Sequence, residues 1–575
     1  TETYKARQLV YDQYGVSGIR CSVLYTEYQR LAQGRPTALQ RGDCCRRRAL
    51  KQASEKTNNQ DVMFWKLYPP QLYGSMFSFI MESVAAAFLF LSFLSIPNQV
   101  VGHGSIPRLL LVSLDGFRWD YLNMAHEIWG VNTPNFDQLI ANGSTIKDGG
   151  MMNVYVTKTR VNHHSIVTGL YAEEHGVVGN FMYDPKTGKR LFSPFHTGSK
   201  EIDPFWYNNG SALKDAPEPI WVTNEKATPT SFTDRSGTYL WPGDLYDIKE
   251  RLPFKYVSQE ERGKPINDTT KIDKIVEWFL LNEPINLGLV HISEPDETGH
   301  FHGTHSEEMK KMIGQLDDLM GHLILRLREN GLYDDTNLIL TSDHGMTQVY
   351  PDRQHINLTD YVPASDARPV GQETVINIFP AKGKEKEVYD KLKKIPNTTT
   401  YWKKDIPDDL HFKYNTRIGP IIIEADPGWQ IVTNQTGDYI HKLYGTHGYT
   451  NKNPDMHPIF IAHGPAFKRG YKIKQFNTVD LYPLMCHILK IQPAKHSGSL
   501  DNVRSMLVEE EFFSITALTI TMAVLLTSTF AAVFAVAACR TNRKSPPISL
   551  KQPPDVIDDS KTVLLADYDG KDECV

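Results

Sequence analysis

The stretch LLLVSLDG, residues 109–116, is a short apolar run that ends on an acidic residue. Three similar runs occur later in the chain: LGLVHI (287–292), NLILTS (337–342) and PIFIAHG (458–464). Segments with helical spacing separate these runs, and such alternation is typical of a sheet that helices cover. We therefore predict an α/β domain over residues 103–500, with a mainly parallel central sheet flanked by helices.

One long helix is expected between the second and third runs. Its apolar residues recur at a spacing of three or four, which predicts one buried face and indicates no chemistry. The residues of this face are Met309, Met312, Ile313, Leu316, Met320, Leu323 and Leu327.

Acidic residues and histidines follow the expected strands. In open α/β sheets, functional groups collect beyond the carboxyl ends of the strands, so we expect these side chains to converge. Each one alone is more often a capping acid or a buried, hydrogen-bonded histidine than a functional group. They are Asp115 in SLDG, Asp296 and His300 in EPDETGH, Asp343 and His344 in TSDHGM, and His447 in GTHGYT.

As a set, the three aspartates and three histidines match two zinc ions, because zinc accepts both carboxylate oxygen and imidazole nitrogen. The i, i+4 spacing of Asp296 and His300 lets both side chains face one ion on a helical turn. Two neighbouring metal ions also suit in-line displacement at phosphorus. The segment VTKTRVNHHS, residues 156–165, offers a threonine hydroxyl, which needs a metal or a base to become a nucleophile.

The overall charge gives no sign of a polyanionic partner. The 575 residues carry a formal net charge of only −5, so no global basic field argues for binding to a nucleic acid polymer or to a membrane surface.

Two long apolar runs predict a secreted, membrane-anchored topology. The first lies in residues 76–102 and reads as a signal peptide, or as a signal anchor if residues 1–75 are a native cytosolic prefix rather than non-native sequence. The second, residues 512–539, is long enough for a transmembrane helix. The basic residues of RTNRK that follow it predict a cytoplasmic tail at 540–575, a stalk at 501–511 and an extracellular catalytic domain at the plasma membrane.

The expected outer domain contains several glycosylation acceptors and little cysteine. Cys486 is the one cysteine in residues 103–500, so no disulfide framework is expected there. The N-x-[ST] acceptors are Asn142, Asn209, Asn267, Asn357, Asn397 and Asn434.

Several motifs, taken in order, resemble one family. They are LLLVSLDGFRWDYL, VTKT, VTGLY, HGVVGN, YLWPG, EPDETGH, TSDHGMT, GTHGY and MHPIFIAHGPAFK, and they extend over nearly all of residues 108–493. The chain resembles the ectonucleotide pyrophosphatase/phosphodiesterases of the alkaline phosphatase superfamily, in particular their short membrane-anchored members.

The resemblance implies a role for each site residue. The first of two zinc ions would be held by Asp296, His300 and His447, and the second by Asp115, Asp343, His344 and the nucleophile Thr159. Asn180, with the backbone N–H of Thr159, would stabilise negative charge on the phosphate. His163, His164 and His175 would then be scaffold. The implied reaction passes through a phosphothreonine and releases a 5′-nucleotide.

The residues expected to contact the substrate match the family pattern less completely. The family usually places an aromatic residue and a proline after the nucleophile, where this chain has Arg160 and Val161. Tyr239 in YLWPG keeps an aromatic that would contact a nucleobase, and Arg160 would stack on a base, pair with a second phosphate or remain solvated. We expect extracellular dinucleoside polyphosphates, NAD or nucleoside triphosphates as substrates.

Two alternatives stay open at this point. A choline-phospholipid phosphodiesterase would need an aromatic or acidic pocket for a quaternary ammonium. A weakly active adhesion or signalling ectodomain would need no metal, whereas this chain has every expected ligand. The absence of a C-x-P-x-R segment disfavours a sulfatase, and the threonine in place of serine disfavours a phosphomonoesterase.

Overall fold

The computed structural model describes residues 107–541, except 193–216, 228–234, 246–247, 250, 263, 435 and 510–514. The expected prefix, the signal segment, the tail beyond residue 541 and the acceptor Asn209 lie outside the described residues.

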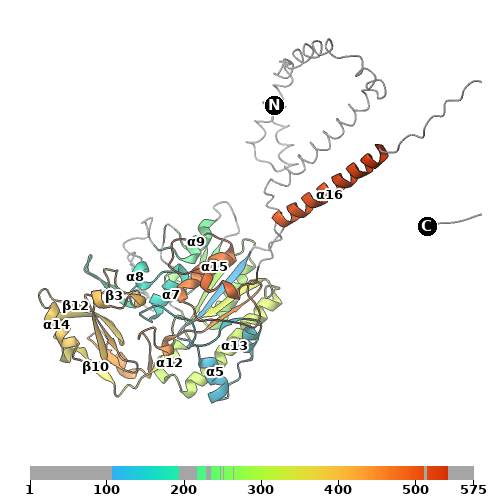
Figure 1. Cartoon of the computed structure of the whole chain (residues 1–575). Helices are drawn as coiled ribbons and strands as arrows, with labels where there is room; N and C mark the ends of the chain where they lie inside the picture. Colours follow the sequence, from blue (N-terminus) through green and yellow to red (C-terminus); the bar gives the residue numbers. More distant parts are fainter. Residues whose placement is uncertain are drawn as a thin grey trace, which may run out of the picture. The chain divides into compact units, whose positions relative to one another are not determined.

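An eight-stranded sheet forms the centre of the fold (Figure 1), with strand order β18-β2-β17-β8-β1-β7-β5-β6. Strand β1 pairs in parallel with both β7 and β8, and β5 pairs in parallel with β7, so the predicted mainly parallel sheet is confirmed. Strand β17 is antiparallel to both of its neighbours, β8 and β2. The strands are β1 (Arg108–Leu114), β2 (Gly143–Ile146), β5 (Ser236–Tyr239), β6 (Lys255–Tyr256), β7 (Leu287–Ile292), β8 (Thr336–Thr341), β17 (Phe460–His463) and β18 (Tyr471–Ile473).

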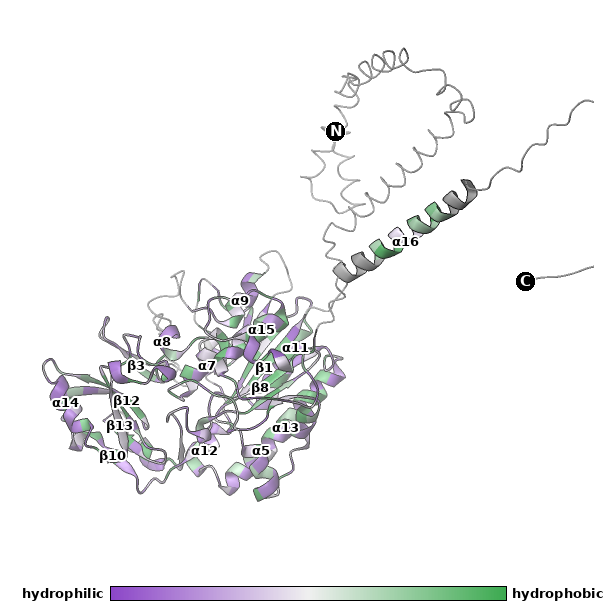
Figure 2. Ribbon diagram, in the orientation of Figure 1, coloured by the Kyte–Doolittle hydropathy of each residue, from purple (hydrophilic) through white to green (hydrophobic). Residues whose placement is uncertain are grey.

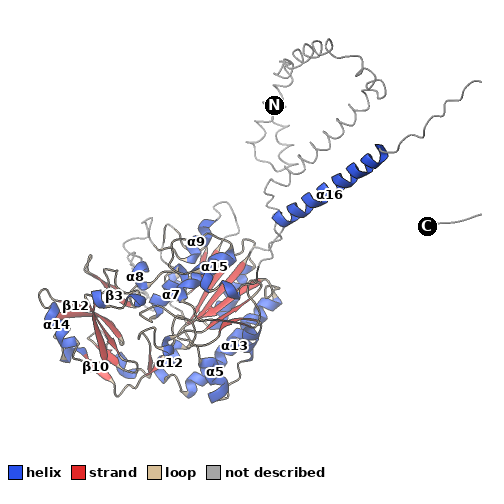
Figure 3. Cartoon of the chain, in the orientation of Figure 1, coloured by secondary structure: helices blue, strands red, loops and turns tan. Residues whose placement is uncertain are grey.

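Helices lie against the sheet as a separate layer on each face (Figure 3). Alternate residues of β1 enter different core clusters, Leu109 and Leu111 with α7 and α15, and Leu110 and Val112 with α11 and α13. A strand that is buried on both faces must be apolar throughout, which explains the green strands β1 and β8 among amphipathic helices in Figure 2. The longer helices are α6 (Pro134–Ala141), α7 (Thr159–Thr168), α9 (Ile220–Ala227), α11 (Asp268–Phe279), α13 (Glu307–Glu329) and α15 (Leu481–Leu489).

Helix α13 is the long helix that the spacing predicted. The Ser306 side chain caps its start by accepting a hydrogen bond from the Met309 N–H at 3.0 Å. The expected apolar face is buried, apart from Met312, which is half-buried.

A second, smaller sheet was not predicted. It is antiparallel, has the order β11-β12-β14-β13, and occurs in the chain between β8 and β17 (Figure 1, gold). Ile376, Ile378, Ile421 and Ile423 from it form a separate core with Val388 of α14. The elements are β11 (Ala367–Gln372), β12 (Val375–Pro380), β13 (Thr398–Trp402), β14 (Ile421–Ala425) and α14 (Glu385–Leu392).

Shorter elements connect the two sheets and their helices. They are α5 (Tyr121–Met124), α8 (Ala172–His175), α10 (Gln259–Arg262), α12 (Asp296–His302), β3 (Phe181–Asp184), β4 (Lys189–Phe192), β9 (Thr347–Gln348), β10 (His355–Asn357), β15 (Gln430–Val432) and β16 (Gly445–Thr446).

The segment expected to be a stalk packs on the catalytic domain as far as residue 508. Val503 and Met506 are buried, the Lys468 N–H donates to the Met506 carbonyl at 2.8 Å, and the Val508 N–H donates to the Ala466 carbonyl at 2.9 Å. The assignment of these residues to a stalk was therefore wrong, because their apolar side chains complete the core.

Helix α16 (Ile515–Thr541) includes most of the second apolar run. Within the part of the chain that the structure describes, no helix combines the length and the apolar character needed to cross a membrane. The anchor at residues 512–539 stays a prediction.

Candidate metal centre and nucleophile

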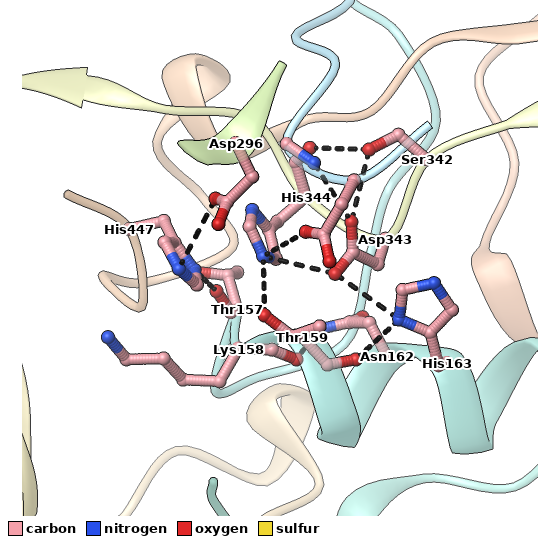
Figure 4. A network of polar contacts seen from close by, with 12 residues as sticks. Thr157, Lys158, Thr159, Asn162, His163, Asp296, Ser342, Asp343, His344 and His447 are labelled. Carbon is pink, nitrogen blue, oxygen red and sulfur yellow. Dashed lines mark hydrogen bonds and ion pairs between the residues drawn. The ribbon is translucent and has the colours of Figure 1, made fainter. Parts of the chain in front are cut away.

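The acids and histidines of the expected strand ends lie together in the structure (Figure 4). Asp115 follows β1 directly, and Asp343 and His344 follow β8. Asp296 opens α12 after β7, and its backbone N–H donates to the Asp115 carbonyl at 2.9 Å. The parallel pairing of β1 with β7 and β8 therefore brings three distant segments to one edge of the sheet.

Thr159 is the first residue of α7 and is half-buried. Its Oγ1 lies 3.2 Å from His344 Nε2. The buried side chain of Asn162 fixes the preceding loop, because its Oδ1 accepts from the Val154 N–H at 2.8 Å and its Nδ2 donates to the Val156 carbonyl at 3.2 Å. The hydroxyl is thus held beside the acids by the start of a helix.

The ligands expected for the second zinc ion form one buried group. His344 Nε2 lies 3.0 Å from Asp343 Oδ2 and 3.4 Å from Asp115 Oδ1, and one ligand atom from each residue falls within 4.8 Å of the others. Asp115 Oδ1 and Asp343 Oδ2 are buried and accept no hydrogen bond from the described residues. Buried carboxylate oxygens need a partner, and a cation would supply one.

The ligands expected for the first zinc ion are also close together. Asp296 Oδ1 lies 3.7 Å from His447 Nε2, and Asp296 Oδ2 lies 3.4 Å from His300 Nε2. Ligand atoms of Asp296, His344 and His447 fall within 4.8 Å of one another, and the His344 and His447 rings stack with centroids 3.5 Å apart. His344 therefore lies between the two expected ligand groups.

Backbone carbonyls orient all three histidines of the expected ligand groups in the same way. The Nδ1 atoms of His300, His344 and His447 lie 2.8, 2.9 and 2.8 Å from the carbonyls of Gly445, Gly345 and Thr157. An Nδ1–H that donates to a carbonyl leaves the Nε2 lone pair as the ligand.

The electrostatics of the site favour a cation. Burial raises the pKa of Asp115 well above its usual range, and the carboxylates of Asp343 and Asp296 raise it further. Burial likewise lowers the pKa of His447 far below its ordinary value, with His344 adding to the effect. Ionised acids and neutral imidazoles coexist at such a site when metal ions offset the negative charge.

Two further histidines support the carboxylates. His291 Nε2 lies 2.9 Å from Asp115 Oδ2, and His163 Nδ1 lies 3.3 Å from Asp343 Oδ2. The sequence predicts only a scaffold role for His163 and does not single out His291. His291 lies within the run LGLVHI, and the pairing of β1 with β7 brings it beside Asp115. His164 and His175 are buried in the core, where His164 Nδ1 lies 2.7 Å from the Arg160 carbonyl.

Asn180 lies against the first turn of α7. Its Oδ1 accepts a hydrogen bond from the Arg160 backbone N–H at 3.1 Å, and its carbonyl accepts from the Arg160 guanidinium at 3.4 Å. Arg160 is 8% exposed, so its side chain folds onto Asn180 and is not solvated. Asn180 is thereby held next to the residue that follows Thr159.

Tyr239 does not lie where the sequence led us to expect. Its ring packs 5.9 Å from that of Trp278 and belongs to the core cluster on the α11 face of the sheet, whereas the Val161 side chain of α7 belongs to the cluster on the opposite face. Strand alternation turns Tyr239 to the same side as Gly237, where an added Cβ would meet Trp278. This placement does not support the base contact predicted for Tyr239.

The described glycosylation acceptors lie on the surface to differing degrees. Asn267, Asn357 and Asn434 are exposed, and Asn142 and Asn397 are half-buried. Their use stays a prediction.

A hydroxyl at the start of a helix, next to clustered Asp and His side chains at the carboxyl ends of a mainly parallel sheet, is the arrangement expected of a metal-dependent hydrolase. Comparison with known sequences narrows this class. The type I phosphodiesterase/nucleotide pyrophosphatase profile matches residues 109–450, and the chain belongs to this family of hydrolases.

Individual relatives agree with this assignment. The chain is 42% identical over 401 residues to human ectonucleotide pyrophosphatase/phosphodiesterase family member 5, an alignment that covers 70% of this chain and 78% of the relative. It is 38% identical over 407 residues to human bis(5′-adenosyl)-triphosphatase ENPP4, covering 70% and 83%. The structure of an inactive threonine-to-alanine variant of murine family member 5 in complex with AMP matches with a TM-score of 0.62 at 40% identity, covering 70% of this chain and all of that one.

Proposed function

We propose that the chain is a zinc-dependent ecto-phosphodiesterase that cleaves extracellular nucleotides through a phosphothreonine intermediate. The observation that carries this proposal is the position of Thr159 Oγ1, 3.2 Å from His344 Nε2 and beside buried carboxylates. A threonine hydroxyl at such a place is set up to act as a nucleophile.

Two Zn²⁺ ions fit the donors that the site offers. Imidazole Nε2 atoms and carboxylate oxygens are zinc ligands, and the buried oxygens of Asp115, Asp343 and Asp296 that accept no hydrogen bond from the described residues are the atoms that a cation would satisfy. When bound, zinc supplies a Lewis acid that lowers the proton affinity of a hydroxyl or a water. Asp296, His300 and His447 would hold the first ion, and Asp115, Asp343, His344 and Thr159 the second.

The chain's own groups account for the bonds that form and break. The Thr159 hydroxyl gives up its proton to solvent as its Oγ attacks the phosphorus, the bond from phosphorus to the leaving oxygen breaks, and phosphothreonine forms. Water then attacks the same phosphorus, the bond to Thr159 Oγ breaks, and Oγ takes up a proton as the 5′-nucleotide leaves, so that the hydroxyl is restored. Each step inverts the phosphorus, so configuration is retained overall.

Negative charge that develops on the phosphate faces donors at the start of α7. The first backbone N–H groups of a helix lack partners within the helix and attract anions. The N–H of Thr159 is one of these, and Asn180 is held beside it by its contact with Arg160. Together they would stabilise the transition state.

The names of the relatives support a nucleotide substrate. One relative is a bis(5′-adenosyl)-triphosphatase, and another was solved in complex with AMP. We therefore propose dinucleoside polyphosphates, NAD and nucleoside triphosphates as substrates of this chain. An extracellular location, with anchoring through residues 512–539, is part of the same proposal.

Replacing Thr159 by alanine tests the function directly. Because the three aspartates and three histidines remain, we expect zinc content and folding to be retained while kcat falls below about a tenth of wild type on ATP, diadenosine triphosphate and NAD. Thr187→Ala, on an exposed turn, is the matched control and should keep full activity.

Other results would redirect the assignment. A Thr159→Ala enzyme with more than about a tenth of wild-type kcat would rule out the nucleophile. Hydrolysis of lysophosphatidylcholine without hydrolysis of nucleotides would favour a choline-phospholipid phosphodiesterase. Purified protein without zinc and without activity would favour an adhesion or signalling ectodomain.

A further inference from the structure

The turn between β11 and β12 reaches from the small sheet to the proposed nucleophile. Glu373 lies in this turn, and its Oε2 accepts a hydrogen bond from Lys158 Nζ at 2.7 Å. The two side chains are 5% and 6% exposed, so this ion pair is buried. Lys158 is the N-cap of α7 and directly precedes Thr159, and its side chain extends from that cap in Figure 4.

The same turn contacts the loop that contains His447. The Thr374 hydroxyl donates to the His447 carbonyl at 3.1 Å. On the other side of that loop, His447 Nδ1 lies 2.8 Å from the Thr157 carbonyl and the Gly448 N–H donates to Thr157 Oγ1 at 3.0 Å. The turn is therefore connected to both segments that meet at the site.

The Glu373 backbone is itself held in place by strand β15, which lies outside the small sheet. Glu373 has a φ of +52°, which a non-glycine residue rarely adopts, and its carbonyl accepts from the Ile431 N–H at 2.5 Å. A side chain on a turn fixed in this way can orient its partner firmly.

The burial of the pair indicates what it does. An ammonium whose charge is met at 2.7 Å by a buried carboxylate adds little net charge to the site. It does fix geometry, because removing one partner of a buried pair leaves the other charge uncompensated. A misplacement of about 1 Å at a reacting group costs on the order of 100-fold in rate.

We propose that Glu373 is a positioning residue, which holds the Lys158 cap of α7 and thereby aims Thr159 Oγ1. This inference rests on the proposed function. On this inference the small sheet takes part in catalysis, because its β11–β12 turn holds the residue that precedes the nucleophile. A direct effect of the Lys158 charge on the phosphate is the competing explanation.

A double-mutant cycle separates the two explanations. We would measure kcat and KM of the full-length protein on a p-nitrophenyl ester of a 5′-nucleotide, for wild type, Glu373→Gln, Lys158→Met and the double variant Lys158→Met/Glu373→Gln. Positioning predicts that both single variants lose about 10- to 100-fold in kcat with KM within about threefold. It also predicts that the double variant loses no more than either single variant.

A control variant and one opposite result complete the test. Asp409→Asn breaks an exposed pair with Lys452, at 2.6 Å, and should leave kcat unchanged. Wild-type kcat in Glu373→Gln, with a loss only in Lys158→Met, would overturn the inference in favour of a direct charge effect.

The same set of variants also shows whether each protein folds and whether the wild type has the proposed activity. If Glu373→Gln does not fold, Glu373→Asp decides, because it keeps the buried negative charge while its shorter side chain draws Lys158 out of place. Wild-type kcat in Glu373→Asp would overturn the inference. An inactive wild type would instead refute the proposed function. Zinc content and thermal unfolding of each variant show which case applies.

Discussion

Replacing Gly448 by alanine should both destabilise the protein and slow catalysis. Gly448 has a φ of +110°, and an added Cβ would overlap Lys158 Cε and Thr374 Oγ1 and lie 3.0 Å from Lys158 Cδ. The backbone conformation costs about 1–3 kcal/mol for a residue other than glycine. Overpacking costs about 1–3 kcal/mol more, because the ion pair with Glu373 prevents Lys158 from moving aside. We therefore expect a loss of about 2–6 kcal/mol in the free energy of unfolding.

A matched glycine isolates the steric part of this loss. Gly331 also has a positive φ, +65°, but an added Cβ there would meet no atom within 4 Å. Gly331→Ala should cost only the backbone contribution, about 1–2 kcal/mol, and should leave kcat unchanged. The assay is urea unfolding followed by tryptophan fluorescence, with kcat measured on the same preparations.

The activity of the Gly448 variant completes the test. Because the Gly448 N–H donates to Thr157 Oγ1 at 3.0 Å, we expect kcat to fall by at least about tenfold as the nucleophile loop shifts. Equal destabilisation by Gly448→Ala and Gly331→Ala, together with unchanged kcat, would refute the tight packing between Gly448, Lys158 and Thr374.

Three further predictions concern substrate, pH and topology. Arg160→Tyr should lower KM for NAD more than for diadenosine polyphosphates, since it adds a stacking face and removes a positive charge beside the nucleophile; equal changes in the two KM values would contradict this. Burial raises the pKa of Glu424 to about 7, above its unfolded value, so the folded state binds the extra proton and stability falls as pH rises from about 4.5 to 7. Glu424→Gln should reduce this pH-dependent decrease in the free energy of unfolding by up to about 3 kcal/mol. Unfolding free energies that are identical for mutant and wild type at both pH 5 and pH 8 would refute this prediction. Truncation before Phe512 should release a secreted enzyme that glycosidase treatment shifts on a gel, and retention of the truncated protein in membranes would argue for an anchor in residues 76–102.

The central sheet could be predicted because its strands are buried on both faces. A run such as residues 109–114 must then be apolar throughout, and the polar residue after it marks the edge where ligands collect. The small sheet gave a weaker signal. Its strand β14, IIIEA, is a buried apolar run, but β11 is partly exposed, with the sequence ARPVGQ, so neither its hydropathy nor its period sets it apart from a loop.

Site residues that follow a strand could be predicted from the sequence, whereas a site residue that lies within a strand could not. Asp115, Asp343 and His344 come directly after buried runs, whereas His291 lies inside β7 and has the burial of any core residue. Tyr239 shows the opposite error, since its motif indicated a base contact while the strand alternation of β5 turned the ring away. Long-range contacts such as that of Glu373 with Lys158 have no local signature in the sequence.

The place of the small sheet in the chain also sets the order in which the site can be assembled. A ribosome makes Asp343 and His344 before the small sheet and His447 only after it. Until that sheet and the later segment have been made, the nascent chain lacks His447, although His300 and His344 are already present. Because domains fold as their segments emerge, we expect metal loading to be a late event in the biosynthesis of this protein, after the small sheet has folded and brought the two halves of the site together.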